Sequence, residues 1–513
     1  AAVHAVDLAV RLEEGGVIAA GDKGLLFLHA GQQILLAALV QLAEHIVQQQ
    51  HGVFAGDAGS SGGLGHLQAQ HHAALLSLAG KHTGRLIVQQ QFQIFPVDAA
   101  QALPGPQLLV LALLQQIGQT ARRKLGRIAD AHALCPVGKL LIVGAGQRPQ
   151  QGKVARLICD IQKRDGSPYE GDSRYILQKV LKEAEGLGYR FDVGPECEFF
   201  LFHTDDDGNP TVFSHEKAGY FDMSPIDQGE NVRRDIILTL EEMGFEVESS
   251  YHEVASAQHE IDFRYDEALL SADNIMTFKL AVKTIAKRFG MHATFMPKPR
   301  AGINGSSMHT NISLKKDGKN VFADENDEYG LSQEAYWFIG GLMKHARGLS
   351  AITNPLVNSY KRLFPAQTGA GFTAPAYISW SPINRSQMIR IPAQREENTR
   401  IELRSPDPSC NPYLTLAVCL AAGLDGIKNH IEPPKSVNED VRKMTDEERM
   451  ALNIEPLPRN LYEALNGLEQ DELVKQVLGE ELCKCYIAAK KQEWESYSAQ
   501  VSQWETEQYL YRF

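Results

Sequence analysis

Residues 194–200, with the sequence GPECEFF, alternate charged and apolar side chains. Successive side chains of a β-strand point to opposite faces, so a strand here places Glu196 and Glu198 on one face and Cys197 on the other. The apolar side chains can then join a core while the two carboxylates line a cavity. We therefore predict a strand at this position and build the fold outward from it.

Two later segments repeat this alternation. They are residues 307–311, SMHTN, with His309 at the centre, and residues 400–404, RIELR, with Glu402 at the centre. A sheet face that carries acids, a histidine and arginines makes a poor hydrophobic core, because buried charges need partners. Such a face suits a cavity that binds metal ions and anionic substrates.

Six side chains on this face are candidate metal ligands. Carboxylates gathered in one place repel one another, and their pKa values rise unless cations neutralise them. Hard divalent ions with oxygen ligands, Mg²⁺ or Mn²⁺, are therefore expected, and the single imidazole favours Mn²⁺ slightly. For any one acid taken alone, the alternative is a solvated loop position or an ion pair with arginine. The six candidates are Glu196, Glu198, Glu253, Glu260, His309 and Glu402.

Five arginines supply the complementary charge. A guanidinium group binds carboxylate or phosphate through two parallel hydrogen bonds, so a cluster of arginines in an acidic protein needs anionic partners. Some will pair with Glu402 and its neighbours, and the rest indicate phosphates and a substrate carboxylate. The five are Arg362, Arg385, Arg390, Arg400 and Arg404.

Regular secondary-structure patterns cover residues 151–513. We predict a strand over 154–161, a helix after a cap at Asp172 or Ser173, and helices over 232–243 and 274–289, each ended by glycine. Strand-like runs follow these helices. The pattern predicts an α+β domain in which helices back a curved antiparallel or mixed sheet, whose other face carries the chemistry.

Residues 1–150 differ sharply in composition from the rest of the chain. They contain no Asn, Met, Trp or Tyr and are rich in Gln, Ala, Leu, Gly and His, whereas the remainder has a normal mixture. No function is assigned to this atypical segment. Its composition indicates either a poorly folding, disordered region or a misread stretch of the coding sequence.

Charge and cysteine content limit the class of protein. A formal net charge of -12 argues against a nucleic-acid partner or an acidic membrane bound by a general basic surface. The seven cysteines are odd in number and mostly scattered, which favours a reduced cytosol. The apolar runs are shorter than the roughly 20 residues that cross a bilayer. We expect a soluble, cytoplasmic protein with no membrane partner.

Five segments resemble the signature segments of bacterial type I glutamine synthetases. The resemblance extends from about residue 150 to residue 513, and the small amino-terminal domain of the family is not recognisable before it. The five segments are residues 194–200 (GPECEFF), 304–309 (NGSSMH), 358–363 (NSYKRL), 384–392 (NRSQMIRIP) and 400–404 (RIELR).

The resemblance implies a glutamine synthetase-type catalytic domain and an ATP-dependent ligase of glutamine biosynthesis and nitrogen metabolism. Its substrates would be glutamate, ammonia and ATP. The γ-carboxylate of glutamate would attack the terminal phosphate of ATP, and ammonia would then displace phosphate from γ-glutamyl phosphate. The family also implies a homo-oligomer, a dodecamer among its bacterial members.

The resemblance further implies roles for individual residues. One divalent ion would be held by Glu198, Glu253 and Glu260, and a second, which bridges the phosphates of ATP, by Glu196, His309 and Glu402. Glutamate would be positioned by Asn304, Gly305, Arg362 and Arg404. The nucleotide would be contacted by Glu248, Tyr265, Asn311, Ser313, Arg390 and Arg400, and by Arg385, which would steady the transferred phosphoryl group as the catalytic arginine.

One loop departs from the family pattern. In the family, a glutamate in the run Pro-Gly-Tyr-Glu-Ala-Pro closes the site and takes a proton from ammonium. Residues 365–375 read PAQTGAGFTAP, so Thr373 stands where the acid belongs, and threonine cannot act as that base. Loss of a general base typically lowers a rate by about 10²–10⁴-fold.

Three functions are therefore open at this point. The chain could be a glutamate–ammonia ligase with an impaired ammonia step. It could be a γ-glutamyl ligase for another amine, which the altered loop admits. It could also be a non-catalytic relative that binds nucleotide and glutamate.

Overall fold

The computed structural model describes residues 9–13, 16–21, 24–29, 92–94, 141–143, 154–364 and 374–513. Thr373 and most of residues 1–150 lie outside these ranges, so the expectations for them, including the boundary near residue 150, stay predictions. The chain divides into two units, residues 1–85 and 86–513, and each is described by itself. The first unit contains an antiparallel sheet of β1 (Ala9–Glu13), β2 (Gly16–Gly21) and β3 (Gly24–His29).

The second unit contains a small antiparallel sheet in addition to its main one. Its strand order is β4 (Phe92–Ile94), β6 (Val154–Leu157) and β5 (Leu141–Val143). The strand predicted over 154–161 is therefore shorter than expected and ends at Leu157.

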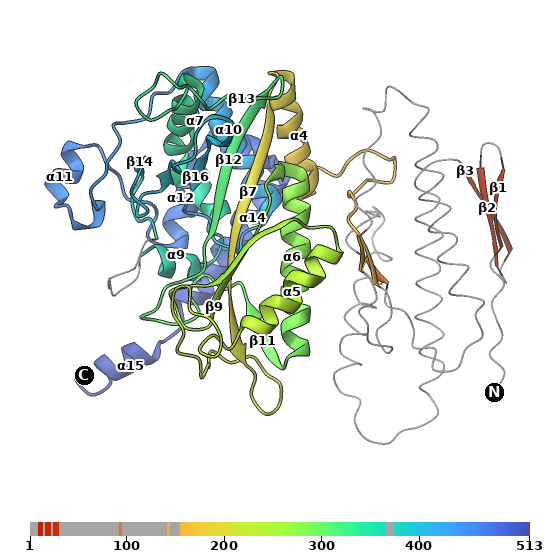
Figure 1. The fold of residues 1–513 in the computed structure, drawn as a ribbon, viewed down its shortest axis with the longest axis horizontal. Coiled ribbons are helices and arrows are strands. Elements are labelled where there is room, and N and C mark those ends of the chain that lie inside the picture. The colour runs from red at the N-terminus through yellow and green to blue at the C-terminus, as the bar shows by residue number, and fades with distance from the viewer. Residues whose placement is uncertain are drawn as a thin grey trace. The chain divides into compact units, whose positions relative to one another are not determined.

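The main sheet of the second unit is mixed, one of the two arrangements predicted (Figure 1). Its main path runs β14-β15-β16-β12-β7-β9-β8, with β14 and β15 parallel and the other neighbours antiparallel. The strands of this path are β7 (Arg190–His203), β8 (Val247–His252), β9 (Gln258–Phe263), β12 (Met308–Lys316), β14 (Trp380–Ser381), β15 (Ile389–Arg390) and β16 (Ile401–Leu403). Beside them, β10 (Asp266–Glu267) and β11 (Met291–Thr294) pair with β7, and β13 (Lys319–Asn320) pairs with β12.

The alternation in β7 separates the core from the site. Cys197 and Phe199 are fully buried and join a hydrophobic cluster with Ile261 of β9. Helices α5 (Glu230–Glu242) and α6 (Ala268–Arg288) contribute apolar side chains to the same cluster. Burial of each large apolar side chain contributes roughly 1.5–3 kcal/mol, so this face fixes which way the strand is turned. Glu196 and Glu198 consequently point to the opposite face.

A second cluster packs most of the remaining helices around α10 (Pro412–Asn429), which is buried along almost its whole length. Close approach of α10 to α7 (Gln333–Lys344) requires glycine, because a Cβ on Gly426 would lie 1.9 Å from the Trp337 carbonyl oxygen. The other helices are α4 (Ser173–Gly186), α7 (Gln333–Lys344), α8 (Ala346–Thr353), α9 (Val357–Leu363), α11 (Asp446–Ala451), α12 (Leu461–Gln470), α13 (Glu472–Leu478), α14 (Glu480–Ser498) and α15 (Gln503–Tyr509), with short 3-10 helices at Glu396–Asn398 and Val441–Lys443.

The predicted helices exist, with some shifted ends. The cap at Asp172 is confirmed, since its side chain accepts a hydrogen bond from the Arg174 backbone at the start of α4. Helix α5 begins two residues before the predicted start at Val232. Helix α6 begins at Ala268 rather than Asn274, because the Glu267 side chain caps it by accepting a hydrogen bond from the backbone of the next turn. Among the described residues, none of the helices combines the length and hydropathy of a membrane span.

Candidate functional site

Three carboxylates meet on the site face of the sheet, and we call them the carboxylate trio: Glu198, Glu253 and Glu260. Each offers an oxygen within 4.8 Å of the others. Glu198 on β7 pairs directly with Glu260 on β9, and Glu253 follows the end of β8. Glu260 Oε1 is buried and has no hydrogen-bond partner among the described residues. An orphaned carboxylate oxygen inside a ring of oxygen donors fits a hard divalent cation.

The electrostatics of the carboxylate trio also favour a bound divalent cation. Burial and the nearby charge of Glu253 raise the pKa of Glu198 to about 8. Burial, followed by the charges of Asp262 and Glu198, raises the pKa of Glu260 well above its ordinary value. Burial also raises the pKa of Glu253. The trio therefore ionises fully at neutral pH only when a cation compensates its charge.

A second group, which we call the mixed trio, consists of Glu196, His309 and Glu402. Its ligand atoms also lie within 4.8 Å of one another. Glu196 on β7 pairs with His309 on β12, and Glu402 comes from β16 on the far side of β12. His309 Nδ1 lies 3.1 Å from Glu196 Oε2 and 3.6 Å from Glu402 Oε1. The two trios have the membership expected from the sequence, and neighbouring strands bring each together.

The mixed trio carries its own compensating groups. Glu402 is fully buried and forms ion pairs with Arg390 and Arg404. Burial alone would raise the pKa of Glu196, but its hydrogen bonds with His309 and Asn311 hold that pKa at about 2. Burial and Arg404 lower the pKa of His309, whose Nδ1 forms a hydrogen bond with Glu196 Oε2.

A cavity of about 370 Å³ opens beside Glu196. Arg400 Nε donates to Asn311 Oδ1 at 3.0 Å on its wall. Arg390, expected at the nucleotide, is held by Glu402 and does not line this cavity. The expected nucleotide contacts that do line it are Glu248, Tyr265, Asn311, Ser313 and Arg400.

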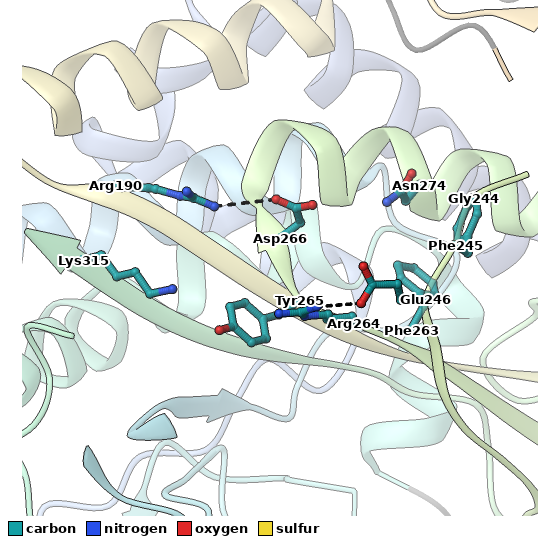
Figure 2. Close-up of a pocket in the computed structure, with 10 residues that line it drawn as sticks. All are labelled: Arg190, Gly244, Phe245, Glu246, Phe263, Arg264, Tyr265, Asp266, Asn274 and Lys315. Atoms are coloured by element: carbon teal, nitrogen blue, oxygen red, sulfur yellow. Dashed lines mark hydrogen bonds and ion pairs between the residues drawn. The ribbon is translucent and has the colours of Figure 1, made fainter. Parts of the chain in front are cut away.

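A second cavity, of about 300 Å³, shares Phe263 and Tyr265 with the first (Figure 2). Figure 2 shows its charged side chains already paired, Arg190 with Asp266 and Arg264 with Glu246. Lys315 Nζ lies 5.1 Å from the centre of the Tyr265 ring and 2.9 Å from the Asp192 carboxylate. The paired charges leave this cavity without a cation reserved for a further anion.

The expected glutamate contacts flank the carboxylate trio. Gln258 Nε2 donates to Glu198 Oε2 at 2.6 Å and to the Gly305 carbonyl at 3.2 Å, which joins the trio to the loop that carries Asn304 and Gly305. A Cβ on Gly305 would lie 2.1 Å from the Pro297 carbonyl oxygen, so only glycine fits there.

Arg362 and Arg404 are both buried close to this loop. Arg362 donates to the backbone carbonyls of Ser405 at 2.8 Å and Arg404 at 2.9 Å. A Cβ on Gly305 would lie 3.2 Å from Arg362 Cγ. The side chain of Arg404 divides its donors between Glu402 and the Arg385 carbonyl. The loop and the two arginines therefore form one wall of the site.

Two site residues were missed from the sequence, Gln258 and Tyr220. The phenol of Tyr220 shares a hydrogen bond with the exposed guanidinium of Arg385, and burial and the charge of Glu253 raise its pKa. Tyr220 lies in an irregular segment before α5, where no periodicity marks it. Gln258 occupies the site face of β9 two residues before Glu260, so strand alternation could have indicated it.

Comparisons with known proteins agree with this geometry. Residues 170–509 match the family model described as glutamine synthetase, catalytic domain. A glutamine synthetase of Clostridium saccharobutylicum is 58% identical over 366 residues, which cover 71% of this chain and 82% of that protein. A glutamine synthetase of Staphylococcus aureus (strain MW2) is 54% identical over 364 residues, covering 71% and 80%.

Solved structures of GmaS share the fold. Its ADP complex in conformation 1 superimposes with a TM-score of 0.63 at 37% identity, covering 69% of this chain and 80% of that one. GmaS without ligand gives a TM-score of 0.61 at 36% identity over the same shares. With a family model matched over more than half of its length and relatives above 50% identity, the chain belongs to the glutamine synthetase family.

Proposed function

We propose that this chain joins ammonia to the γ-carboxylate of glutamate at the expense of ATP and so forms glutamine. The observation that carries the proposal is the meeting of two metal-ligand trios with a nucleotide-sized cavity on one sheet face. Membership of the glutamine synthetase family supports the same reaction.

The carboxylate trio would hold one Mg²⁺ or Mn²⁺ and the mixed trio the other. Bound divalent ions neutralise phosphate charge and polarise the transferred phosphoryl group. The orphaned Glu260 Oε1 and the raised pKa values of the carboxylate trio support an ion there. In the mixed trio, His309 would supply a nitrogen ligand, and Glu196 and Glu402 oxygen ligands.

The 370 Å³ cavity would receive the nucleotide. Tyr265 offers an aromatic face and Arg400 a planar guanidinium, and both groups stack on nucleobases. Asn311 contacts both Glu196 and Arg400, so the nucleotide pocket and the mixed trio share a hydrogen-bond network. This arrangement would aim the phosphates toward the metal site.

Arginines would compensate the charge that develops during phosphoryl transfer. Arg385 is exposed and adjacent to Tyr220, so its guanidinium can turn toward the transferred phosphoryl group. Arg362 and Arg404 would orient glutamate beside Gly305, whose lack of a Cβ lets the substrate approach the backbone. Each of these groups binds or neutralises, and none needs to act as a base.

The amine step supports a second candidate. Thr373 at the position of the family's base is consistent with a γ-glutamyl ligase that uses an amine other than ammonia. A weakly basic amine, which is neutral at pH 7, needs no base before it attacks, whereas ammonium must lose a proton first. The two candidates share the phosphoryl-transfer half of the reaction.

A pair of assays separates these functions. Formation of γ-glutamyl hydroxamate from hydroxylamine, together with ammonia-dependent phosphate release, is expected of a ligase, and the absence of both would leave only a non-catalytic binder. Phosphate release measured across a series of amines then identifies the preferred nucleophile. A higher rate with another amine than with ammonia would favour the second candidate.

Thr373→Glu tests the altered loop directly. We expect ammonia-dependent turnover to rise, by up to about 10²–10⁴-fold if the base is the missing element. Thr368→Glu is the matched control, because it adds the same charge to the same loop five residues earlier. Unchanged turnover in Thr373→Glu would contradict the role given to this position.

We further propose a cytoplasmic homo-oligomer. The described cysteines are all unpaired, as in a reducing compartment. Trp504, Leu510, Tyr511 and Phe513 at the end of the chain expose large apolar surfaces, which suits burial against another copy. Light scattering of the wild type beside a chain shortened before Trp504 tests this, since a monomeric wild type would contradict it.

A further inference from the structure

Two histidines lie behind the carboxylate trio, each directly before one of its glutamates. His252 precedes Glu253 at the end of β8, and His259 precedes Glu260 on β9. The two histidines are directly paired across the strands, with ring centres 4.9 Å apart and planes at 81°. Because side chains alternate along a strand, His259 occupies the face of the sheet opposite to Glu260.

Glu216 ties the turn between these strands to the segment before α5. Its Oε1 accepts hydrogen bonds from His252 Nε2 and, at 2.7 Å, from the backbone of Ala257. Ser256 Oγ donates to the Glu216 carbonyl at 2.6 Å. His252 Nδ1 lies 2.6 Å from the Glu253 carbonyl oxygen, so each ring nitrogen faces an oxygen atom. The contacts of Glu216 with His252, Ser256 and Ala257 thereby hold both ends of the turn between β8 and β9.

Arg233 ties β9 to α5 in the same way. Its Nη1 donates to Asp227 Oδ2 at 2.5 Å and to His259 Nδ1 at 2.9 Å, and its Nε donates to Ser250 Oγ at 3.1 Å. A Cβ on Gly229 would lie 2.4 Å from His259 Cε1, so the ring fills the space against the start of α5. The ring is therefore held by both a hydrogen bond and close packing.

This rear cluster, Glu216, Asp227, Arg233, His252 and His259, has a composition that also occurs in metal sites. Its two carboxylates and two imidazoles offer ligand atoms within 4.8 Å of one another. The guanidinium of Arg233, however, already contacts Asp227 and His259, and its positive charge would repel a divalent ion. The cluster is therefore closed by an internal cation and acts as a support.

We propose that His252 and its partners in the rear cluster are positioning residues, which hold the backbone of Glu253 and Glu260 so that the carboxylate trio is formed before a metal ion arrives. The inference rests on the proposed function only in taking the trio as a metal site. Three carboxylates that repel one another tend to separate, and hydrogen bonds behind the sheet oppose that movement. Partners behind a metal ligand typically change metal affinity by about 10–100-fold when removed.

The test is a titration with Mn²⁺ alone, in which free Mn²⁺ is counted by electron paramagnetic resonance. The wild type is expected to bind two ions per chain. His252→Leu removes both ring bonds and is expected to weaken one of the two sites by about 10–100-fold, with the other unchanged. His252→Asn retains a donor near the position of Nδ1, toward the Glu253 carbonyl, and is expected to recover most of the affinity.

His345→Leu is the matched control. His345 is also buried and bonded at both ring nitrogens, to Asp471 between α12 and α13 at 2.8 Å and to Asp425 of α10 at 3.0 Å. Its loss is expected to lower stability without changing Mn²⁺ affinity. Glu216→Gln provides a milder second variant, with the same site weakened to a smaller degree, should His252→Leu not fold.

The outcomes separate the inference from the function on which it rests. Two ions bound by wild type and by His252→Leu and Glu216→Gln with equal affinity would overturn the inference and leave the metal sites standing. Equal weakening in His345→Leu would also overturn it, because the effect would then be general destabilisation. No Mn²⁺ bound by the wild type would instead refute the metal sites themselves.

Discussion

In the mixed trio, Glu402 lies between Arg390 and Arg404, and Glu196 accepts hydrogen bonds from His309 and Asn311. The carboxylate trio lies a short distance along β7. It is mostly buried, and the pKa values of its members are raised by that burial and by the negative charges of neighbouring carboxylates. The first group is compensated by the protein, whereas the second depends on an ion from outside. Two sites built from similar ligands on one sheet therefore differ in what holds them together.

Of the substitutions that test this difference, Glu402→Ala is expected to change the free energy of unfolding most. Its loss leaves Arg390 and Arg404 without their buried partner, so the free energy of unfolding should fall by about 3–5 kcal/mol even without metal. Urea unfolding of the metal-free protein measures this. Wild-type stability in Glu402→Ala would show that the mixed trio is not held by these ion pairs.

Glu260→Gln is expected to raise the free energy of unfolding of the metal-free protein, whereas Glu402→Ala lowers it. An amide of the same size cannot ionise, and burial with the charges of Asp262 and Glu198 disfavours the ionised carboxylate, so the metal-free protein should gain stability. Added Mn²⁺ should then raise the melting temperature less than in the wild type. A loss of stability like that of Glu402→Ala would break the contrast between the trios.

A pH series sharpens the contrast further. The pKa of Glu198 is about 8 in the folded protein against an ordinary 4.5, so between these values the folded state binds more protons than the unfolded state. Stability of the metal-free protein should therefore fall as pH rises from about 5 to 8, and each kcal/mol lost should lower the melting temperature by roughly 1 °C.

Glu198→Gln is the control for that series. The variant lacks the titrating group, so its melting temperature should fall less steeply over the same range, and excess Mg²⁺ should flatten the wild-type curve. Identical slopes for wild type and variant would contradict the proposed charge imbalance.

The smallest expected effect concerns Tyr265, which lines both cavities, and Lys315, which lines the second. Lys315→Gln removes the cation over the Tyr265 ring, an interaction worth about 0.5–1 kcal/mol at exposed sites, so KM for ATP should rise by about 2–5-fold. Lys316→Gln is the matched control, because Lys316 lies over Tyr189 instead. Equal KM values in the two variants would show that Lys315 does not affect ATP binding through the Tyr265 ring.

Local alternation within three short segments was sufficient to predict the face that Glu196, Glu198, His309 and Glu402 share. The fully buried Cys197 between Glu196 and Glu198 is the direct consequence of that alternation. Alternation cannot give the strand register that pairs Glu196 with His309 and Glu198 with Glu260. The resemblance to a known family supplied the membership of the two trios.

Contacts between distant and irregular segments could not be predicted. The bond between Glu216 and His252 joins residues 36 apart, and Glu216 lies in a segment without helix or strand. The early start of α6 depends on a side-chain cap at Glu267, which the apolar spacing of the helix does not encode. The first feature is set by the tertiary fold and the second by a local side-chain cap, and both were missed.

The most direct test of the central claim is a crystal grown with Mn²⁺ and measured at the manganese absorption edge. Two anomalous peaks per chain are predicted, one coordinated by Glu198, Glu253 and Glu260 and the other by Glu196, His309 and Glu402. Peaks at other residues, or no peak within either trio, would contradict the claim that these six side chains hold two divalent cations.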